Sequence, residues 1–167
     1  MIVMKLDPIK GDCKIEGYPN YITLDDVSWD INREPKESGK GATQDLNFGI
    51  AEAGAVNLTK TMDIASVDLM RMATGGGASP SQCLIEFIQS GVGGADSGKY
   101  VPYLQITLKR PVVKKWGINA SGDDRPTESI EIMYNSIEMK YMSTDDKGKQ
   151  QTFGPKGWDL VAGKGLG

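Results

Sequence analysis

Acidic side chains occur in close pairs at Asp123-Asp124, at Asp145-Asp146, and at Glu128 with Glu131. Two carboxyl groups that converge in a cleft can share the roles of general acid and general base. The chain contains no histidine, which removes the commonest general base, triad base and zinc ligand. Because acidic groups in turns and on strands are usually solvated, we expect no catalytic residue, no metal site and no cofactor.

Glycine spacing near the C-terminus approaches that of a phosphate-binding loop without completing it. Between Gly157 and Gly165 the glycines stand one residue too far apart, and Gly165 replaces the hydroxyl that would hold magnesium. The glycine clusters at 75–77 and 91–94 do not continue into a dinucleotide-binding fingerprint. We interpret these clusters as turns between short strands.

The two cysteines, Cys13 and Cys83, do not have the spacing of a redox motif. Two buried, reduced thiols are the interpretation that we favour, and a single disulfide is the alternative. Both residues are expected to belong to the core.

The composition describes an acidic chain of ordinary domain size. At 167 residues the chain is long enough to bury a substantial core, so we expect a single domain over 1–167. Its net charge is −3 and its basic residues are scattered, which argues against a nucleic-acid partner. No run is apolar and long enough for membrane insertion. Lys5 and Pro8 interrupt the segment where a secretory signal would be apolar, so any export is expected to use another route.

Apolar residues recur at every second position in the last third of the chain, which predicts strands with one buried face. The pattern runs through 104–108 and again through 130–134. It then moves from even to odd positions, so that Ile137, Met139 and Tyr141 continue it. A slip of one residue needs a bulge or bend to keep one face inward, and bent strands allow sheets to close into barrels.

One helix is expected, from Ser66 to Thr74. Ser66 is a suitable N-cap, and Gly75 can end the helix in the left-handed conformation. The run from Cys83 to Ile88 is apolar on both phases, as in a strand that lies between two layers. We expect the helix to cover one face of this strand.

A further strand is predicted from Val27 to Ile31, and a segment rich in Gly, Lys, Glu and Ala follows it. We expect a long extended loop at about 34–55. Loops of this length in a compact domain are usually either functional or disordered.

The order and spacing of several segments resemble the hemolysin-coregulated protein (Hcp) family, which forms the inner tube of bacterial type VI secretion systems. Val67 departs from the family pattern, in which a proline usually follows the serine that opens the helix, but proline is preferred there and not required. The alternation of basic and acidic residues at 34–55 is a second departure. The resemblance covers nearly the whole chain and is carried by Ile15-Glu16-Gly17, Val27-Ser28-Trp29, Lys60 to Ser66, Tyr103 to Leu108, Thr127 to Ile132 with Ile137 and Tyr141, and Gly157-Trp158-Asp159.

The resemblance implies an all-β fold with one short helix: a closed β-barrel or two packed sheets flanked by an α-helix, as in tail tubes. It implies homohexameric rings that stack into a hollow tube, capped by a spike-tip protein and driven out by a contractile sheath, with secreted effectors in the lumen. The subunit would lie in the bacterial cytoplasm before firing and outside the cell afterwards, without a signal peptide. A ring of this kind needs a heterologous interface, in which two different patches of each subunit meet.

Two groups of residues are expected to face partners in such a tube. Ser28, Asp30 and Asn32 lie on the phase opposite the apolar residues of their strand and are expected to face the lumen. The segment 34–55 is expected to be mobile in the isolated subunit and ordered at a contact between subunits or rings. The residues expected at that contact are Lys36, Glu37, Lys40, Gln44 and Asp45.

Two other functions remain as alternatives. A contractile-phage tail-tube protein would have the same architecture. A carboxylate-dependent enzyme on a β-sandwich would require two acidic side chains to converge in a cleft.

Overall fold

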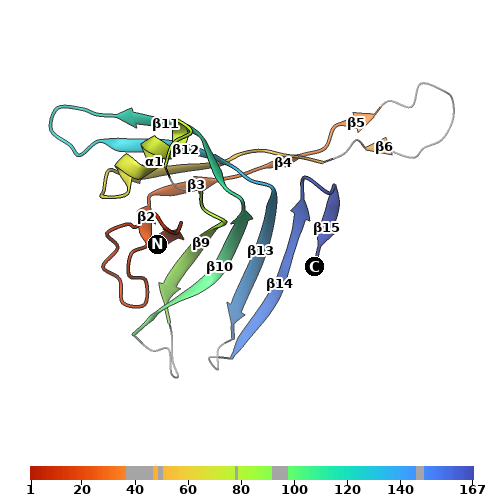
Figure 1. Cartoon of the computed structure of the whole chain (residues 1–167). Helices are drawn as coiled ribbons and strands as arrows, with labels where there is room; N and C mark the ends of the chain where they lie inside the picture. Colours follow the sequence, from red (N-terminus) through yellow and green to blue (C-terminus); the bar gives the residue numbers. More distant parts are fainter. Residues whose placement is uncertain (37–46, 49–50, 78, 92–97, 146–148) are drawn as a thin grey trace.

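The chain folds into two antiparallel sheets packed against each other, with a helix beside the smaller sheet (Figure 1). The computed structural model describes residues 1–36, 47–48, 51–77, 79–91, 98–145 and 149–167. The seven-stranded sheet has the order β15 (Lys164–Leu166), β14 (Gln150–Asp159), β13 (Ser136–Thr144), β10 (Tyr100–Lys109), β9 (Gln82–Ser90), β1 (Ile2–Lys5) and β2 (Ile22–Leu24). The four-stranded sheet has the order β11 (Val112–Asn119), β12 (Thr127–Met133), β8 (Val56–Thr61) and β3 (Asp26–Ser28).

A narrow ribbon continues from the four-stranded sheet and projects away from the body of the protein (Figure 1). It pairs β4 (Ile31–Asn32) with β7 (Glu52–Ala53), and further out β5 (Pro35–Lys36) with β6 (Asn47–Phe48). We call this ribbon the arm. The segment predicted as a loop at 34–55 therefore contains the short paired strands β5, β6 and β7 among its described residues.

The core lies between the two sheets, as the alternation of apolar residues predicts. Leu58 of β8 and Ile130 and Ile132 of β12 face inward from the small sheet and are almost fully buried. Ile85 of β9 and Leu108 of β10 meet them from the large sheet and have no exposed surface. Burial of side chains of this size contributes about 1.5–3 kcal/mol each to folding.

The shift in the apolar alternation near Tyr134 marks a change of sheet and not a bulge within one strand. β12 ends at Met133 in the small sheet, and β13 begins at Ser136 in the large sheet. The chain changes sheets between them, so Ile132 and Ile137 both face the core from opposite sides. The predicted bend exists, but it separates two strands.

The two packed sheets and the flanking helix agree with the fold class predicted from the sequence. The sheets do not close into a barrel, because β15 and β2 form the two ends of the larger sheet and do not pair with each other among the described residues.

Helix α1 (Ser66–Ala73) ends as predicted and begins one residue differently. The amide of Gly75 donates to Met72 O and that of Gly76 to Arg71 O, both at 3.1 Å, with Gly75 at φ +79°, which is a Schellman ending. The N-cap is Ala65 and not Ser66. The Ser66 hydroxyl instead accepts a hydrogen bond from the Asp63 amide at 2.9 Å and lies inside the protein.

The helix also covers a different strand from the one predicted. α1 packs against β11 and not over β9. The outer face of β9 is covered by the segment that precedes β2, where Tyr18 packs with Val3 and Ile88. Both cysteines are free: Cys83 lies in the main core, and Cys13 is half-buried within this covering segment. No helix in the described ranges is long and apolar enough to cross a membrane.

Candidate assembly interface

The outer face of the four-stranded sheet is polar over β3, β8 and the first part of β12, whereas the exposed Met133 of β12 pairs with the exposed Val112 at the β11 edge. Strand alternation turns Val27, Leu58 and Ile130 toward the core, so their neighbours face solvent. The cross-strand register places Ser28 beside Asn57, and Thr59 between Asp26 and Ser129. The exposed members of this polar face are Asp26, Ser28, Asn57, Thr59, Thr61, Thr127 and Ser129. These short side chains leave a flat and hydrophilic surface.

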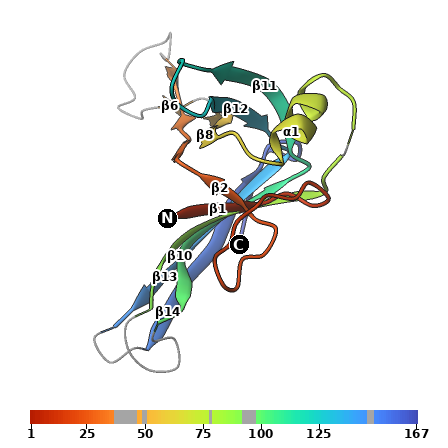
Figure 2. The ribbon, with the colours of Figure 1, turned by 90° about the vertical axis from the view of Figure 1, so that its left-hand side faces the viewer.

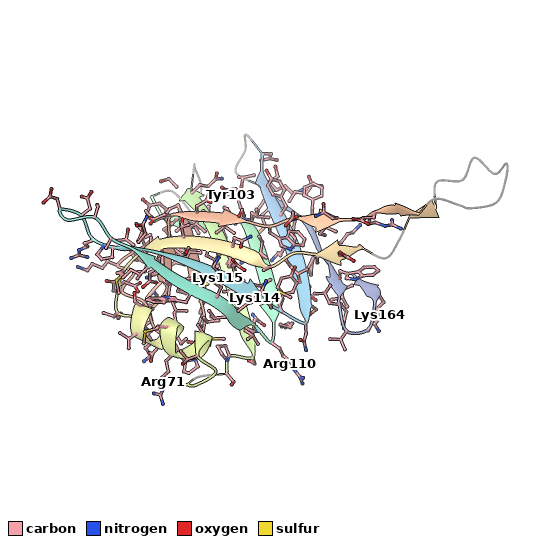
Figure 3. The ribbon with its side chains drawn as sticks, turned by 90° about the horizontal axis from the view of Figure 1, so that it is seen from above. Arg71, Tyr103, Arg110, Lys114, Lys115 and Lys164 are labelled. Carbon is pink, nitrogen blue, oxygen red and sulfur yellow. The ribbon has the colours of Figure 1, made fainter. Side chains whose placement is uncertain are left out.

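Both edges of this sheet are free in the described chain. β3 pairs only with β8, and β11 pairs only with β12. Free strand edges present unpaired backbone donors and acceptors, which are available to another strand. Figure 3, which views the sheet from above, shows Lys114 and Lys115 on β11 along one edge and the arm continuing from the β3 side.

The residues predicted to face a lumen lie on or next to the polar face. Ser28 belongs to β3 and is exposed, and Asn32 is exposed on β4 at the root of the arm. Asp30 lies between them, and its carboxylate accepts a hydrogen bond of 2.9 Å from the Asn32 amide. The structure thus places all three at the surface. Whether they face a channel stays a prediction.

Tyr134 fixes the root of the arm to the body. Its hydroxyl donates to Gly54 O at 2.9 Å and accepts a hydrogen bond of 2.6 Å from Trp29 Nε1. The Gly54 amide donates to Asp30 O at 3.0 Å, and desolvation raises the pKa of Tyr134 above its ordinary value. Sequence analysis missed this role because Tyr134 fits the apolar alternation of β12, which gives no sign of a polar contact.

The predicted contact residues lie further along the same segment. Lys36 belongs to β5, where it pairs with Asn47. Glu37, Lys40, Gln44 and Asp45 lie outside the described residues.

An apolar groove of about 320 Å³ separates the arm from the large sheet. Trp29, Ile31 and Ala53 line it from the arm side, and Met139 and Trp158 from β13 and β14. Ile31 and Met139 are 48% and 46% exposed.

Beyond the groove the same face of β13 and β14 stays apolar. Tyr141 and Phe153 are 48% and 50% exposed, pair across the two strands, and have ring centroids 6.5 Å apart. Figure 2 shows the reason for their exposure: the long strands project past the small sheet, which covers only their upper part. We call Ile31, Met139, Tyr141 and Phe153 the apolar ledge. The expectation that Met139 fills the core is wrong, because alternation identifies a face of a strand but not the length over which it is covered.

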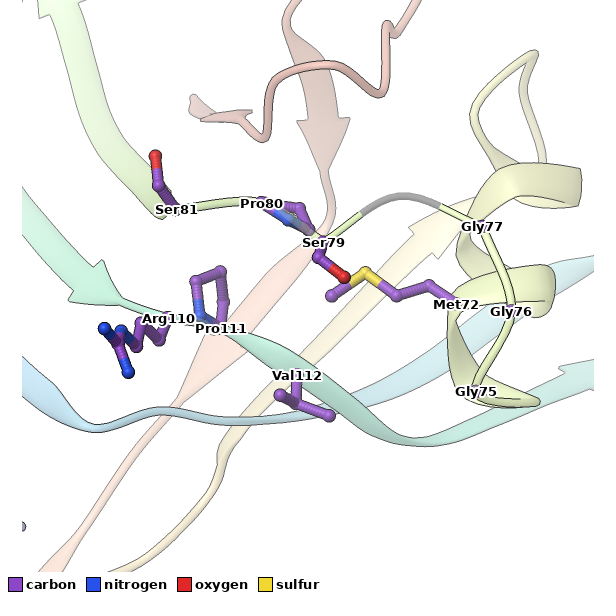
Figure 4. A pocket seen from close by; sticks show the side chains of 10 residues that line it. All are labelled: Met72, Gly75, Gly76, Gly77, Ser79, Pro80, Ser81, Arg110, Pro111 and Val112. Atoms are coloured by element: carbon purple, nitrogen blue, oxygen red, sulfur yellow. The ribbon is translucent and has the colours of Figure 1, made fainter.

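A second hollow, of about 550 Å³, lies where α1 ends and β10 turns into β11 (Figure 4). Met72, the glycines at 75–77 and Arg110 contribute to its lining. Arg110 adopts φ +48°, and Figure 4 shows its side chain turned away from the glycine loop. The described lining residues include no carboxylate and no side-chain base, so the hollow lacks the groups that acid–base or nucleophilic catalysis requires.

Glu128 and Glu131, one of the acidic pairs noted in the sequence, do not converge. Glu128 points into the protein, where Oε2 contacts Lys60 Nζ at 3.2 Å. Glu131 lies on the opposite face of β12 and accepts a hydrogen bond of 3.0 Å from Lys115, which lowers its pKa below the usual value. No group of three or more potential His, Cys, Asp or Glu ligands occurs in the part of the chain that the structure describes.

The sequence matches the family model described as "Type VI secretion system effector, Hcp" over residues 3–141. The chain belongs to the Hcp family. A solved structure described as "Structure of a type six secretion system protein" is 27% identical, with a TM-score of 0.84, and the match covers 99% of this chain and 98% of that chain. No curated protein matches the sequence.

Two further solved structures share the fold at lower identity. Hcp1 from Salmonella typhimurium is 20% identical, with a TM-score of 0.73, and 99% of this chain and 97% of that chain are covered. A type VI secretion system effector from Yersinia pestis is 16% identical, with a TM-score of 0.66, and 92% and 98% are covered. This member of the Hcp family thus carries a largely polar sheet face, two free sheet edges and an arm in the part of the chain that the structure describes.

Proposed function

We propose that the chain is a structural subunit of a type VI secretion tube, and that its copies form homohexameric rings which stack. The observation that carries this proposal is the four-stranded sheet, whose outer face is largely polar and whose two edges are free. Pairing of the β11 edge of one copy with the β3 edge of the next repeats the same heterologous contact around a ring. The role is mechanical, and the subunit catalyses no reaction.

The dimensions of such a ring support a channel. Six copies supply about 24 strands, and strands spaced by about 4.8 Å with a tilt of about 40° enclose a backbone circle about 48 Å across. The polar face lines this circle, with Ser28, Asp30 and Asn32 directed to the lumen. Effectors inside would be held by scattered polar contacts and not by a deep pocket.

The arm supplies contacts outside the wall of the ring. The residues that meet a neighbouring subunit or the next ring are Lys36, Glu37, Lys40, Gln44 and Asp45, of which all but Gln44 are charged. The assembled tube meets the spike-tip protein and the contractile sheath. The subunit is held in the bacterial cytoplasm until firing and is then secreted.

Negative-stain electron microscopy and sedimentation velocity of the purified chain test the proposal. We expect ring-shaped particles with a central hole, and a strictly monomeric chain at high micromolar concentration contradicts the proposal.

The lumen assignment has its own test. Asn32→Arg places a long charged side chain in the channel, so we expect rings of unchanged size that retain less effector in a pull-down. Unchanged retention of effector would show that Asn32 does not face the lumen.

A further inference from the structure

Helix α1 carries a second exposed apolar surface, on its side away from β11. Val67 and Met70 are 66% and 41% exposed, and Ile64, three residues before Val67, is 65% exposed. A spacing of three residues puts Val67 and Met70 on one side of the helix, while Leu69 and Met72 face inward, and Ile64 lies in the turn just before the helix. We call Ile64, Val67 and Met70 the helix stripe. Neighbouring exposed apolar side chains of this kind mark interaction sites.

The helix stripe and the apolar ledge lie near opposite edges of the four-stranded sheet. α1 packs against β11, which is one free edge. The ledge begins at Ile31, where the chain continues from β3, the other free edge, into the arm. Figure 3 shows this separation, with Arg71 of α1 on the β11 side of the sheet and the arm leaving from the β3 side.

Pairing of β11 of one copy with β3 of the next places the edge that carries α1 against the edge from which the arm continues. Both surfaces lie on the core side of the small sheet and away from its polar face. A two-fold dimer would bring each surface against its own copy, whereas a head-to-tail ring brings the two different surfaces together at every contact.

Charge at the rims of the two surfaces is complementary. Asp68 is exposed beside Val67 on the helix, and Lys156 is exposed at the groove, where it pairs with Met139 across β13 and β14. Opposite charges beside an apolar contact fix its register and exclude wrong pairings.

We propose that the helix stripe of one copy packs into the apolar ledge of the next copy, with Asp68 facing Lys156. This inference rests on the proposed ring and names the surfaces that hold its subunits together. Val67 and Met70 of one subunit meet Ile31 and Met139 of its neighbour.

Cross-linking with a short bismaleimide tests this contact. The variant V67C/M139C is expected to give a ladder of linked subunits on a denaturing gel, whereas V67C alone, M139C alone and the unmodified chain are not. A dimer band from V67C alone would mean that the helix meets its own copy, and it would overturn the inference. Rings that are visible by microscopy without any ladder would overturn it too, and would leave the proposed function standing. A chain that forms no rings at all would overturn both.

A charge exchange provides an independent test if the cysteine variants do not fold. D68K and K156D are each expected to lower the association constant between neighbouring subunits by about twofold to fivefold at low salt, as for other partly solvated ion pairs. D68K/K156D should restore the fraction of chain in rings. The control V161S removes an exposed valine in the turn between β14 and β15, outside both surfaces, and should leave assembly unchanged. Equal loss in the single and double charge variants would contradict the Asp68 contact.

Discussion

Lys60 places its side-chain nitrogen in the interior of the protein, beside two carboxyl groups. Its side chain is 0% exposed, and Nζ lies 2.8 Å from Asp63 Oδ1 and 3.2 Å from Glu128 Oε2. The same ammonium group donates to Ser66 Oγ at 3.3 Å, so one side chain links β8, β12 and the first turn of α1. This arrangement explains why Ser66 faces inward and does not cap the helix.

Replacing Lys60 by methionine would leave two carboxylates without their cation. We expect Lys60→Met to lower the free energy of unfolding by about 3–5 kcal/mol, because removal of one partner leaves a buried charge unpaired. Urea denaturation followed by circular dichroism measures the loss. The matched control is Lys115→Met, which removes an exposed partner of Glu131 and should lower the free energy of unfolding far less, because solvent screens this pair. A loss of the same small size for Lys60→Met would show that water reaches the cluster.

Cys83 and Cys13 should differ in reactivity and in their effect on alkaline stability. Burial raises the pKa of the Cys83 thiol from its ordinary value of 9.0 to about 12, whereas Cys13 is half-buried. We expect iodoacetamide at pH 8 to modify Cys13 in the native protein and to reach Cys83 only after unfolding. Mass spectrometry of digested samples distinguishes the two sites.

The sign of the pH effect follows from the raised pKa. Between pH 9 and pH 12 the folded state keeps the Cys83 proton that the unfolded state releases, so the free energy of unfolding falls as pH rises through this window. Burial also raises the pKa of Tyr18 to about 12, which adds to the same decline. Cys83→Ala should flatten part of the slope, and an unchanged slope in that variant would exclude Cys83 as a cause.

Among the elements, the arm is joined to the body at its root through the Tyr134 hydroxyl. The Tyr134 hydroxyl bonds both Trp29 and Gly54, so it joins the two strands of the arm root to the point where the chain changes sheets. Tyr134→Phe leaves the Trp29 N–H and the Gly54 carbonyl without this partner, and we expect a cost of about 1–3 kcal/mol. Hydrogen exchange should become faster at Ala53 and Gly54 while the strands of the core stay protected. Tyr100→Phe, at an exposed tyrosine, is the control.

Sequence patterns predicted most elements because alternation and capping are local properties. The strands around Leu108 and Ile130 follow from period two, and the helix end follows from the left-handed Gly75. The pattern could not show that residues on either side of Tyr134 belong to different sheets, because a change of sheet and a bulge shift the phase in the same way. It also could not show that Met139 is exposed, because cover depends on how far the partner sheet extends.

At the scale of the whole molecule, the polar and the apolar surfaces of the described residues face in different directions. The polar face of the small sheet points one way, and the apolar ledge and helix stripe lie on its other side near opposite edges. In the proposed ring, one heterologous contact, repeated, would bury both apolar surfaces and leave the polar face in water. The arm extends past this contact and is therefore available for a separate role in stacking.

Deleting residues 36–41 should separate ring formation from ring stacking. The deleted segment includes Lys36, Glu37 and Lys40, which carry charge and cannot contribute to a core, so thermal stability should change little. We expect rings to persist by sedimentation velocity while stacked tubes, counted by electron microscopy, and secretion both decrease. Replacing the six residues by glycine and serine tests charge at constant length. In the unmodified chain, stacking should fall as salt rises from about 0.1 M to 1 M, because the screening length shortens from about 10 Å to about 3 Å. A deletion variant that unfolds, or one that stacks normally with the same salt dependence, would show that these charges do not join the rings.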